Sequence, residues 1–244
     1  MNVIVSYKHL KCQTAACHLT VKVSRALECM TVTNSAYQAI ADYIDTTTEH
    51  ALPVAAARTY AEEFGINPPE EATCQLLASL AAAQQGDAGA VAITPAAGLV
   101  GLYVLPVLPG RAQLTCIDPE SEHQAHAKAL FREAGFAPSA ARFLPSRPLD
   151  VLGRLATGSY HLIFADVSSL DLSALIDLAF PLLTVGGTLV LNDSLLDGTL
   201  ADGTRRDRET VAAREADDKA RSLEGAVVTR LPLGAGLTLL TKTA

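Results

Sequence analysis

The sequence contains no tryptophan, and aromatic residues make up only 5% of its 244 positions. It has no apolar run of the roughly 18 residues that a membrane-spanning helix needs. Internal repeats and low-complexity tracts are also missing, and residues 1–29 lack the continuous apolar segment of a signal peptide. We therefore expect neither a membrane span nor secretion.

Basic residues are fewer than acidic ones, with 19 lysines and arginines against 26 aspartates and glutamates. The resulting net charge of -7 argues against non-specific binding to nucleic acid or to an anionic membrane surface. Hydrophobic residues make up 49% of the chain and its mean hydropathy is +0.24, which excludes a disordered protein. A chain of this length can bury a large core as one α/β domain.

The sequence has five cysteines, an odd number, and their spacing does not suggest a disulfide framework. Cys74 and Cys116 fall in apolar segments, where buried free thiols are common. A reduced, cytoplasmic location fits this pattern best. A zinc site built from Cys12, Cys17, His18 and Cys29 is a weak alternative, because the spacing matches no familiar zinc motif.

The first 29 residues differ from the rest and carry four basic residues against the single acid Glu28. We interpret residues 1–29 as an extension outside the domain, with Met30 as an alternative start; the other interpretation is a strand pair at residues 3–5 and 19–23. Residues 30–244 are predicted to form one domain, with helices in residues 30–87 and an α/β core in residues 88–244. The expected helices are one capped by Ser35, one at residues 53–64, and one starting at Asn67.

The core is organised around residues 88–120. We predict a strand at 90–93, a turn of small residues at 94–98, a helix at 99–108 and a second strand at 114–117. The second strand ends on Asp118, about 20 residues beyond the turn, where nucleotide-binding α/β folds hold the two ribose hydroxyls. The alternative is an ordinary strand–helix–strand unit in which Asp118 only caps the next helix.

Three further strands are predicted at 141–144, 160–165 and 188–191. Asp166 directly follows the second of these strands, and Asn192-Asp193 directly follows the third. Helices are expected to start with Pro119 in the first turn and at 149–156, 171–183 and 202–224, and Gly186-Gly187 is expected to form a turn. Residues 226–243 read as a hairpin. The predicted fold is therefore α/β: five parallel strands and a C-terminal antiparallel hairpin, with the polar strand ends along one edge.

Three segments together resemble the S-adenosylmethionine-dependent O-methyltransferases of the catechol and caffeoyl-CoA type, especially their bacterial members. They are INPPEEATCQLLASLA, PLLTVGGTLVLNDSLLDG and LPLGAGLTLLTK, and the likeness extends from about Ile66 to the C-terminus. The resemblance implies a Rossmann-like class I methyltransferase fold with a mostly parallel seven-stranded sheet and helices on both faces. It also implies S-adenosylmethionine as cofactor, a small-molecule hydroxyl acceptor, and a homodimer.

The resemblance also implies site residues. Its cofactor-binding positions are Asn67, Thr94, Pro95, Ala96, Gly98, Asp118, Ser146, Arg147 and Asp166. Asp166 and Asp193 are the catalytic candidates. The family's metal positions correspond to Asp166, Asn192 and Asp193, whose oxygen ligands suit Mg²⁺ or Ca²⁺.

Several positions depart from the family pattern. Ala92 replaces an acid of the first motif, and Thr94 and Ala96 replace two of its glycines. The Asp-Asn pair is reversed, and Ser169 stands where several members have a lysine. We therefore expect the reaction not to depend on a metal.

Two other functions stay open at this point. Ala96-x-Gly98-x-x-Gly101 followed by Asp118 is a degenerate dinucleotide fingerprint, which would suit an NAD-dependent oxidoreductase. The lost motif residues would also suit a catalytically impaired relative that binds cofactor or serves as an interaction module. Binding of NADH and of S-adenosylhomocysteine distinguishes these functions.

Overall fold

The computed structural model describes residues 36–84 and 86–244, and the chain divides into two units, residues 1–48 and 49–244. The predicted extension, its alternative strand pair, the weak zinc alternative and the Ser35 cap all lie outside the described residues. In the first unit, residues 36–47 form a helix, as predicted. Its side chains Tyr37, Ile40 and Tyr43 are exposed.

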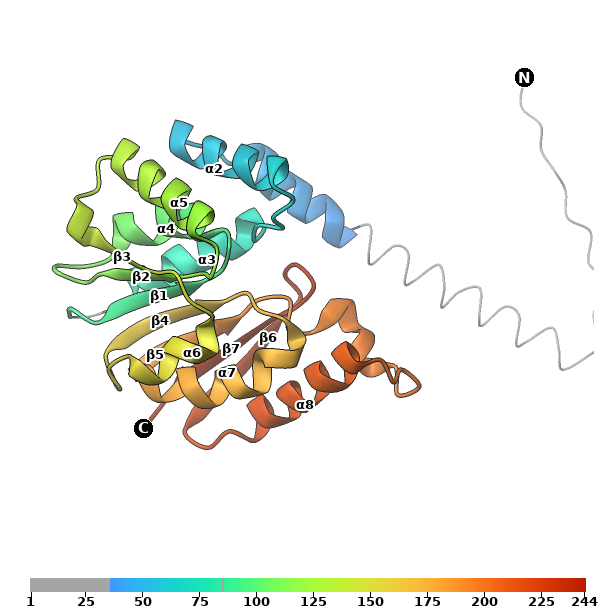
Figure 1. The fold of residues 1–244 in the computed structure, drawn as a ribbon. Coiled ribbons are helices and arrows are strands. Elements are labelled where there is room, and N and C mark those ends of the chain that lie inside the picture. Colours follow the sequence, from blue (N-terminus) through green and yellow to red (C-terminus); the bar gives the residue numbers. More distant parts are fainter. Residues whose placement is uncertain (1–35, 85) are drawn as a thin grey trace, which may run out of the picture. The chain divides into compact units, whose positions relative to one another are not determined.

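The second unit is built on the predicted seven-stranded sheet (Figure 1). Its strands are β1 (Gly89–Ile93), β2 (Leu114–Ile117), β3 (Ala141–Leu144), β4 (Tyr160–Ala165), β5 (Leu183–Leu191), β6 (Ala226–Leu231) and β7 (Leu237–Lys242). Their order is β3-β2-β1-β4-β5-β7-β6. Neighbouring strands among β1–β5 pair in parallel, whereas β7 pairs antiparallel with β5 and with β6.

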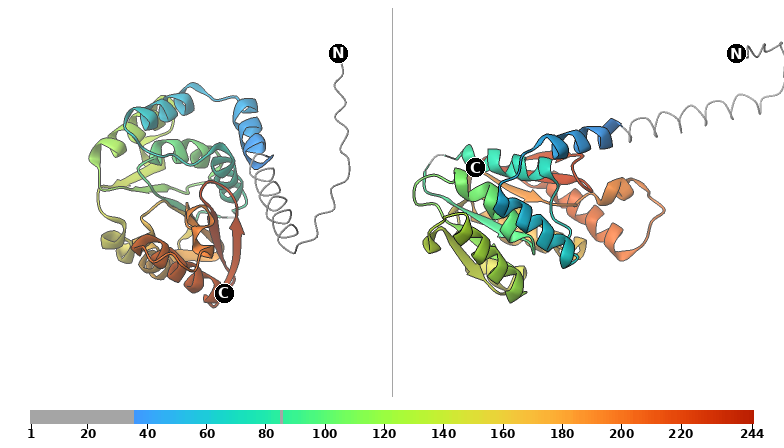
Figure 2. Two further views of the ribbon diagram at one scale, coloured as in Figure 1. Left: turned by 90° about the vertical axis from the view of Figure 1, so that its right-hand side faces the viewer. Right: turned by 90° about the horizontal axis from the view of Figure 1, so that it is seen from above.

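Helices cover both faces of the sheet (Figure 2). One face carries α2 (Leu52–Glu63), α3 (Glu71–Ala82), α4 (Ala97–Val104) and α5 (Ser121–Glu133); the other carries α6 (Pro148–Val151), α7 (Leu172–Ala179) and α8 (Arg208–Ser222). Alternate residues of β1 enter different cores: Ala90 and Ala92 pack with α3–α5, and Val91 and Ile93 pack with α7. Within residues 36–84 and 86–244, every helix is too short or too polar to span a bilayer.

Short 3-10 turns connect several of these elements. They span Leu105–Val107, Pro138–Ala140, Leu152–Arg154, Ser169–Asp171, Phe180–Leu182 and Leu196–Ala201. Three predicted helices are therefore shorter than expected. The helix predicted to reach residue 108 ends at Val104, and the one predicted to reach residue 183 ends at Ala179, because Pro106 and Pro181 supply no N–H for a further α-helical bond. The one predicted at 149–156 shrinks to α6 and a 3-10 turn.

Three helix starts also differ from the predictions. Asn67 does not cap α3, which begins after Glu70, because the two prolines that follow Asn67 favour extended backbone. Pro119 precedes α5, since the Asp118 carboxylate accepts the Glu120 N–H in a turn before the helix. The charged helix predicted from residue 202 begins at Arg208, where Asp207 caps it by accepting the Thr210 N–H at 2.9 Å.

Gly186 and Gly187 do not form a turn, because they lie inside β5. The pairing passes from Tyr160–Leu183 to Leu162–Thr188, so residues 184–187 bulge out opposite His161. Gly186 has φ +81°, and a Cβ at Gly187 would approach the Tyr160 carbonyl oxygen to 2.9 Å. The bulge therefore requires both glycines.

The charge pattern of α8 offers two ion pairs at i, i+4, Glu215–Lys219 and Asp217–Arg221, and the second of them forms. Arg221 Nε lies 3.0 Å from Asp217 Oδ2. Lys219 instead pairs with Asp177 and donates to the Ser173 carbonyl, because α8 packs against α7. Cys74 and Cys116 are buried free thiols, as predicted.

Replacing Gly101 by alanine is expected to destabilise the fold, although alanine is the better helix former. A Cβ at this position in α4 would overlap the ring of Phe131 on α5. Overpacking of this kind costs about 1 to 3 kcal/mol, so the urea midpoint should fall. Gly153→Ala is the control, because a Cβ there meets no atom within 4 Å. An unchanged midpoint for Gly101→Ala would contradict the tight packing of α4 on α5.

Candidate functional site

A cleft of about 440 Å³ opens at the carboxyl ends of β1, β2 and β4. The strand order reverses between the neighbours β1 and β4, because the chain crosses from β3 at the sheet edge to β4, and clefts at such a switch point commonly hold ligands. The cleft is lined by the predicted site residues Thr94, Pro95, Asp118, Arg147 and Asp166. Its volume falls in the range of small-molecule and cofactor sites.

A more open groove of about 530 Å³ adjoins the cleft. The two share Pro95 and the segment 166–168, and the groove continues along residues 64–67 and His123. Asn67 lies in this groove, in the connection between α2 and α3. The cleft and the groove together bring six of the predicted cofactor-binding residues around one continuous space.

Ala96, Gly98 and Ser146 are not among the residues that line this space. A Cβ at Gly98 would come within 2.9 Å of Leu130 Cδ1, so this glycine allows α4 to approach α5. Ala96 is buried at the start of α4. The Ser146 N–H donates to the Leu144 carbonyl just beyond β3. The cofactor-binding role of these three residues stays a prediction.

The turn after β1 is closed by Thr94. Its hydroxyl accepts the Ala96 N–H at 3.1 Å and donates to Asp166 Oδ2 at 3.2 Å. Thr94 is 2% exposed. The threonine that replaces a glycine of the family motif thus joins the ends of β1 and β4.

Asp118 is held firmly at the end of β2. It is 5% exposed, its Oδ1 accepts the Glu120 N–H at 3.3 Å, and its Oδ2 lies 2.6 Å from His123 Nδ1. The Gln124 amide donates to the Asp118 carbonyl at 2.9 Å. The carboxylate is therefore fixed in the cleft, with lone pairs left to accept the hydroxyls of a ligand.

Asp166, Asn192 and Asp193 gather at the ends of β4 and β5. Burial, and then the negative charge of Asp193, raise the pKa of Asp166, while hydrogen bonds from Thr94 and Asn192 oppose this shift. Asp193 Oδ1 accepts the Ala235 N–H at 2.9 Å from the β6–β7 turn. Its backbone is left-handed, with φ 49°, a conformation that Asp and Asn adopt more readily than most residues.

Replacing Asp193 by asparagine is expected to lower the pKa of Asp166. The change removes the negative charge, yet the amide oxygen of asparagine can still accept the Ala235 N–H. Carboxyl-carbon NMR titration measures the shift. Thr94→Val should raise the pKa of Asp166, because it removes a hydrogen bond that Thr94 donates to the charged carboxylate. Shifts of the same sign in both variants would contradict this account of Asp166.

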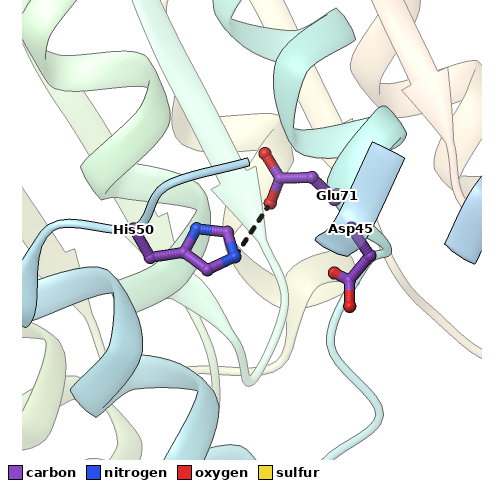
Figure 3. A group of neighbouring side chains, drawn as sticks. All are labelled: Asp45, His50 and Glu71. Carbon is purple, nitrogen blue, oxygen red and sulfur yellow. Dashed lines mark ion pairs between the residues drawn. The ribbon is translucent and has the colours of Figure 1, made fainter. Parts of the chain in front are cut away.

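Sequence reasoning missed His123 and Glu71. The only sequence clue to His123 was its place in the first turn of the helix that follows a strand-end acid. Glu71 is 3% exposed and accepts from Arg58 Nη2 and from the Tyr103 hydroxyl, each at 2.6 Å. His50 Nε2 lies 3.9 Å from the same carboxylate (Figure 3). This network ties α2, α3 and α4 together.

Known proteins resemble this chain in sequence over most of its length. A profile of the O-methyltransferase family matches residues 41–243. A protein of Mycolicibacterium smegmatis, named "Putative O-methyltransferase", is 36% identical over 203 residues, which is 83% of this chain and 96% of that protein. A protein of the same name from Mycolicibacterium vanbaalenii is 34% identical over 200 residues, or 82% of this chain and 88% of that protein.

Solved structures share the fold. A Corynebacterium glutamicum protein is 60% identical with a TM-score of 0.83, and the match covers 86% of this chain and 98% of that one. The O-methyltransferase TomG of Streptomyces achromogenes, solved in complex with SAM, has a TM-score of 0.76 at 21% identity, covering 84% and 96% of the two chains. At that identity the likeness to TomG shows the fold alone.

Proposed function

The chain belongs to the O-methyltransferase family, and on that premise we propose that its cleft binds S-adenosylmethionine and that it methylates a hydroxyl of a small-molecule acceptor. The observation that carries the proposal is Asp118, a buried carboxylate fixed at the end of β2 in a cleft of suitable volume. A carboxylate in this place can accept both hydroxyls of a ribose. When bound, S-adenosylmethionine supplies a methyl group for direct displacement by the acceptor oxygen.

The neighbouring residues can assist this transfer. Arg147, which lines the cleft but not the groove, is available to contact the adenine end. Asp166, whose pKa is raised by burial and by the charge of Asp193, is suited to take the proton from the acceptor hydroxyl. Asp193 is the second catalytic candidate, acting on Asp166 through its charge.

The three residues at the family's metal positions do not fit a cation cage well. Asp166 accepts hydrogen bonds from Thr94 and Asn192, and Asp193 Oδ1 accepts the Ala235 N–H, so the oxygens of both carboxylates are already partly satisfied by protein donors. Hard cations such as Mg²⁺ need several free oxygen ligands. We therefore propose that the transfer proceeds without a metal. Methyl transfer that stops in EDTA and returns with Mg²⁺ would refute this.

We also propose a cytoplasmic homodimer. Its support is the exposed apolar side chains Tyr37, Ile40 and Tyr43 on the helix of residues 36–47, and the buried free thiols Cys74 and Cys116. Light scattering coupled to size exclusion measures the oligomeric state. A monomer at micromolar concentration would contradict the dimer.

Calorimetry with S-adenosylhomocysteine tests the central proposal. We expect binding, followed by turnover with S-adenosylmethionine on an acceptor from a panel of catechols, flavonoids and acyl thioesters. Binding without turnover on this panel would favour a catalytically impaired relative. Binding of NADH alone would favour an oxidoreductase, and no binding of either ligand would favour an interaction module.

A further inference from the structure

The turn after β1 offers few donors for the carboxylate of an amino acid. Pro95 has no N–H, and the Ala96 N–H is already taken by the Thr94 hydroxyl at 3.1 Å. Ala92, on β1, supplies no charge at all. If the cleft binds S-adenosylmethionine as proposed, the charged amino-acid part of that molecule needs partners elsewhere.

The groove beside the cleft supplies one charge of each sign. It is lined by residues 64–67, Pro95, His123 and residues 166–168. Among these lining residues, which all belong to the described part of the chain, His123 alone can become cationic and Asp166 alone is a carboxylate. A zwitterionic α-amino acid is complementary to such a pair, because it presents a carboxylate and an ammonium group.

His123 is positioned to act at the junction of the two spaces. Its Nδ1 lies 2.6 Å from Asp118 Oδ2, and its side chain is 19% exposed. Asp118 lines the cleft, whereas His123 lines the groove. The ring of Tyr60 packs edge-on against the imidazole, with the centroids 6.4 Å apart. Because Nδ1 is held by Asp118, Nε2 is the nitrogen left for a ligand.

We propose that His123, through Nε2, binds the carboxylate of the amino-acid part of S-adenosylmethionine. The Asp118 carboxylate at Nδ1 fixes the orientation of the ring, and in an imidazolium both nitrogens donate, Nδ1 to Asp118 and Nε2 to the ligand carboxylate. Asp166 supplies the opposite charge in the same groove. His123 thus replaces the backbone donors that the turn at Thr94–Pro95–Ala96 lacks. This inference rests on the proposed function.

Two ligands and one substitution distinguish binding of the ligand carboxylate by His123 from a role in which His123 only holds Asp118 in place. His123→Asn keeps an amide N–H close to the place of Nδ1 and removes Nε2. S-adenosylhomocysteine has the amino-acid part, whereas 5′-methylthioadenosine has the same nucleoside and sulfur without it. The variant should bind S-adenosylhomocysteine roughly 10- to 100-fold more weakly, as for loss of a hydrogen bond to a charged group, and 5′-methylthioadenosine within about threefold of the wild type. Calorimetry measures both affinities.

His126→Asn is the matched control, being the same change one turn further along α5. His126 stacks on Tyr60, with the ring centroids 3.7 Å apart, and does not line the groove. Its replacement should leave the ratio of the two affinities unchanged. Equal weakening of both ligands by His123→Asn would show that His123 only holds Asp118, and unchanged affinities would also overturn the inference. A wild-type protein that binds neither ligand would refute the proposed function itself.

Discussion

Replacement of Asp118 by alanine should weaken the binding of S-adenosylhomocysteine by roughly 100-fold, since two hydrogen bonds to a charged group are lost. The carboxylate is 5% exposed and fixed by Glu120 and His123, so it is ordered before a ligand arrives. Because the side chain is already ordered, binding loses little free energy to fixing its conformation. Calorimetry measures the change directly.

The control for this substitution is Glu122→Ala. Glu122 is an exposed carboxylate on α5 that does not line the cleft, and its loss removes the same charge four residues further along the chain. Glu122→Ala should bind S-adenosylhomocysteine like the wild type. If Asp118→Ala also binds normally, the cleft holds its ligand by other groups and the assignment of the ribose position is wrong.

Replacement of Glu71 by alanine should lower the free energy of unfolding by about 3 to 5 kcal/mol. The change leaves the Arg58 guanidinium and the Tyr103 hydroxyl without their shared acceptor in a buried site. In a protein of this size, such a loss lowers the melting temperature by roughly 10 °C. Thermal unfolding followed by circular dichroism measures it. Glu63→Ala, an exposed change on α2, should leave the melting temperature within about 2 °C.

The same network predicts how stability depends on pH. Burial alone would raise the pKa of Glu71, but hydrogen bonds from Tyr103, Gln75 and Arg58 outweigh it and hold the pKa below the ordinary value. A carboxyl whose folded pKa is depressed stabilises the fold above its unfolded pKa. That contribution is lost as the pH falls through the folded pKa. Glu71→Gln should therefore flatten the acid side of the stability curve; an identical acid slope would contradict a charged Glu71.

The sheet could be predicted because its determinants are local. Short apolar runs marked the strands, and the residues directly after them, Asp118 and Asp166, were expected at one edge of the sheet and lie there. Helix ends were harder, because a proline such as Pro106 ends an α-helix while allowing a 3-10 turn to continue. The pair Gly186-Gly187 looked like a turn, whereas its conformation is set by the pairing of β5 with β4.

The partners of side chains could not be predicted, because they depend on how elements pack. Glu71 is bound by Arg58 and Tyr103, which are 13 and 32 residues away in the sequence. Lys219 had a suitable acid one turn away on its own helix, but it pairs with Asp177 on α7. His123 becomes a candidate only once its ring is seen between Asp118 and the groove.

One hydrogen bond also bears on when the fold is completed during synthesis. The Gly234 N–H donates to Glu70 Oε1 at 2.6 Å, which joins the start of α3 to the turn before β7. A growing chain therefore emerges from the ribosome with α2 and α3 long before their distant anchor exists. Because β7 also enters the sheet between β5 and β6, a nascent chain that stops before residue 234 leaves β5 at an open edge of the sheet and β6 without its partner strand.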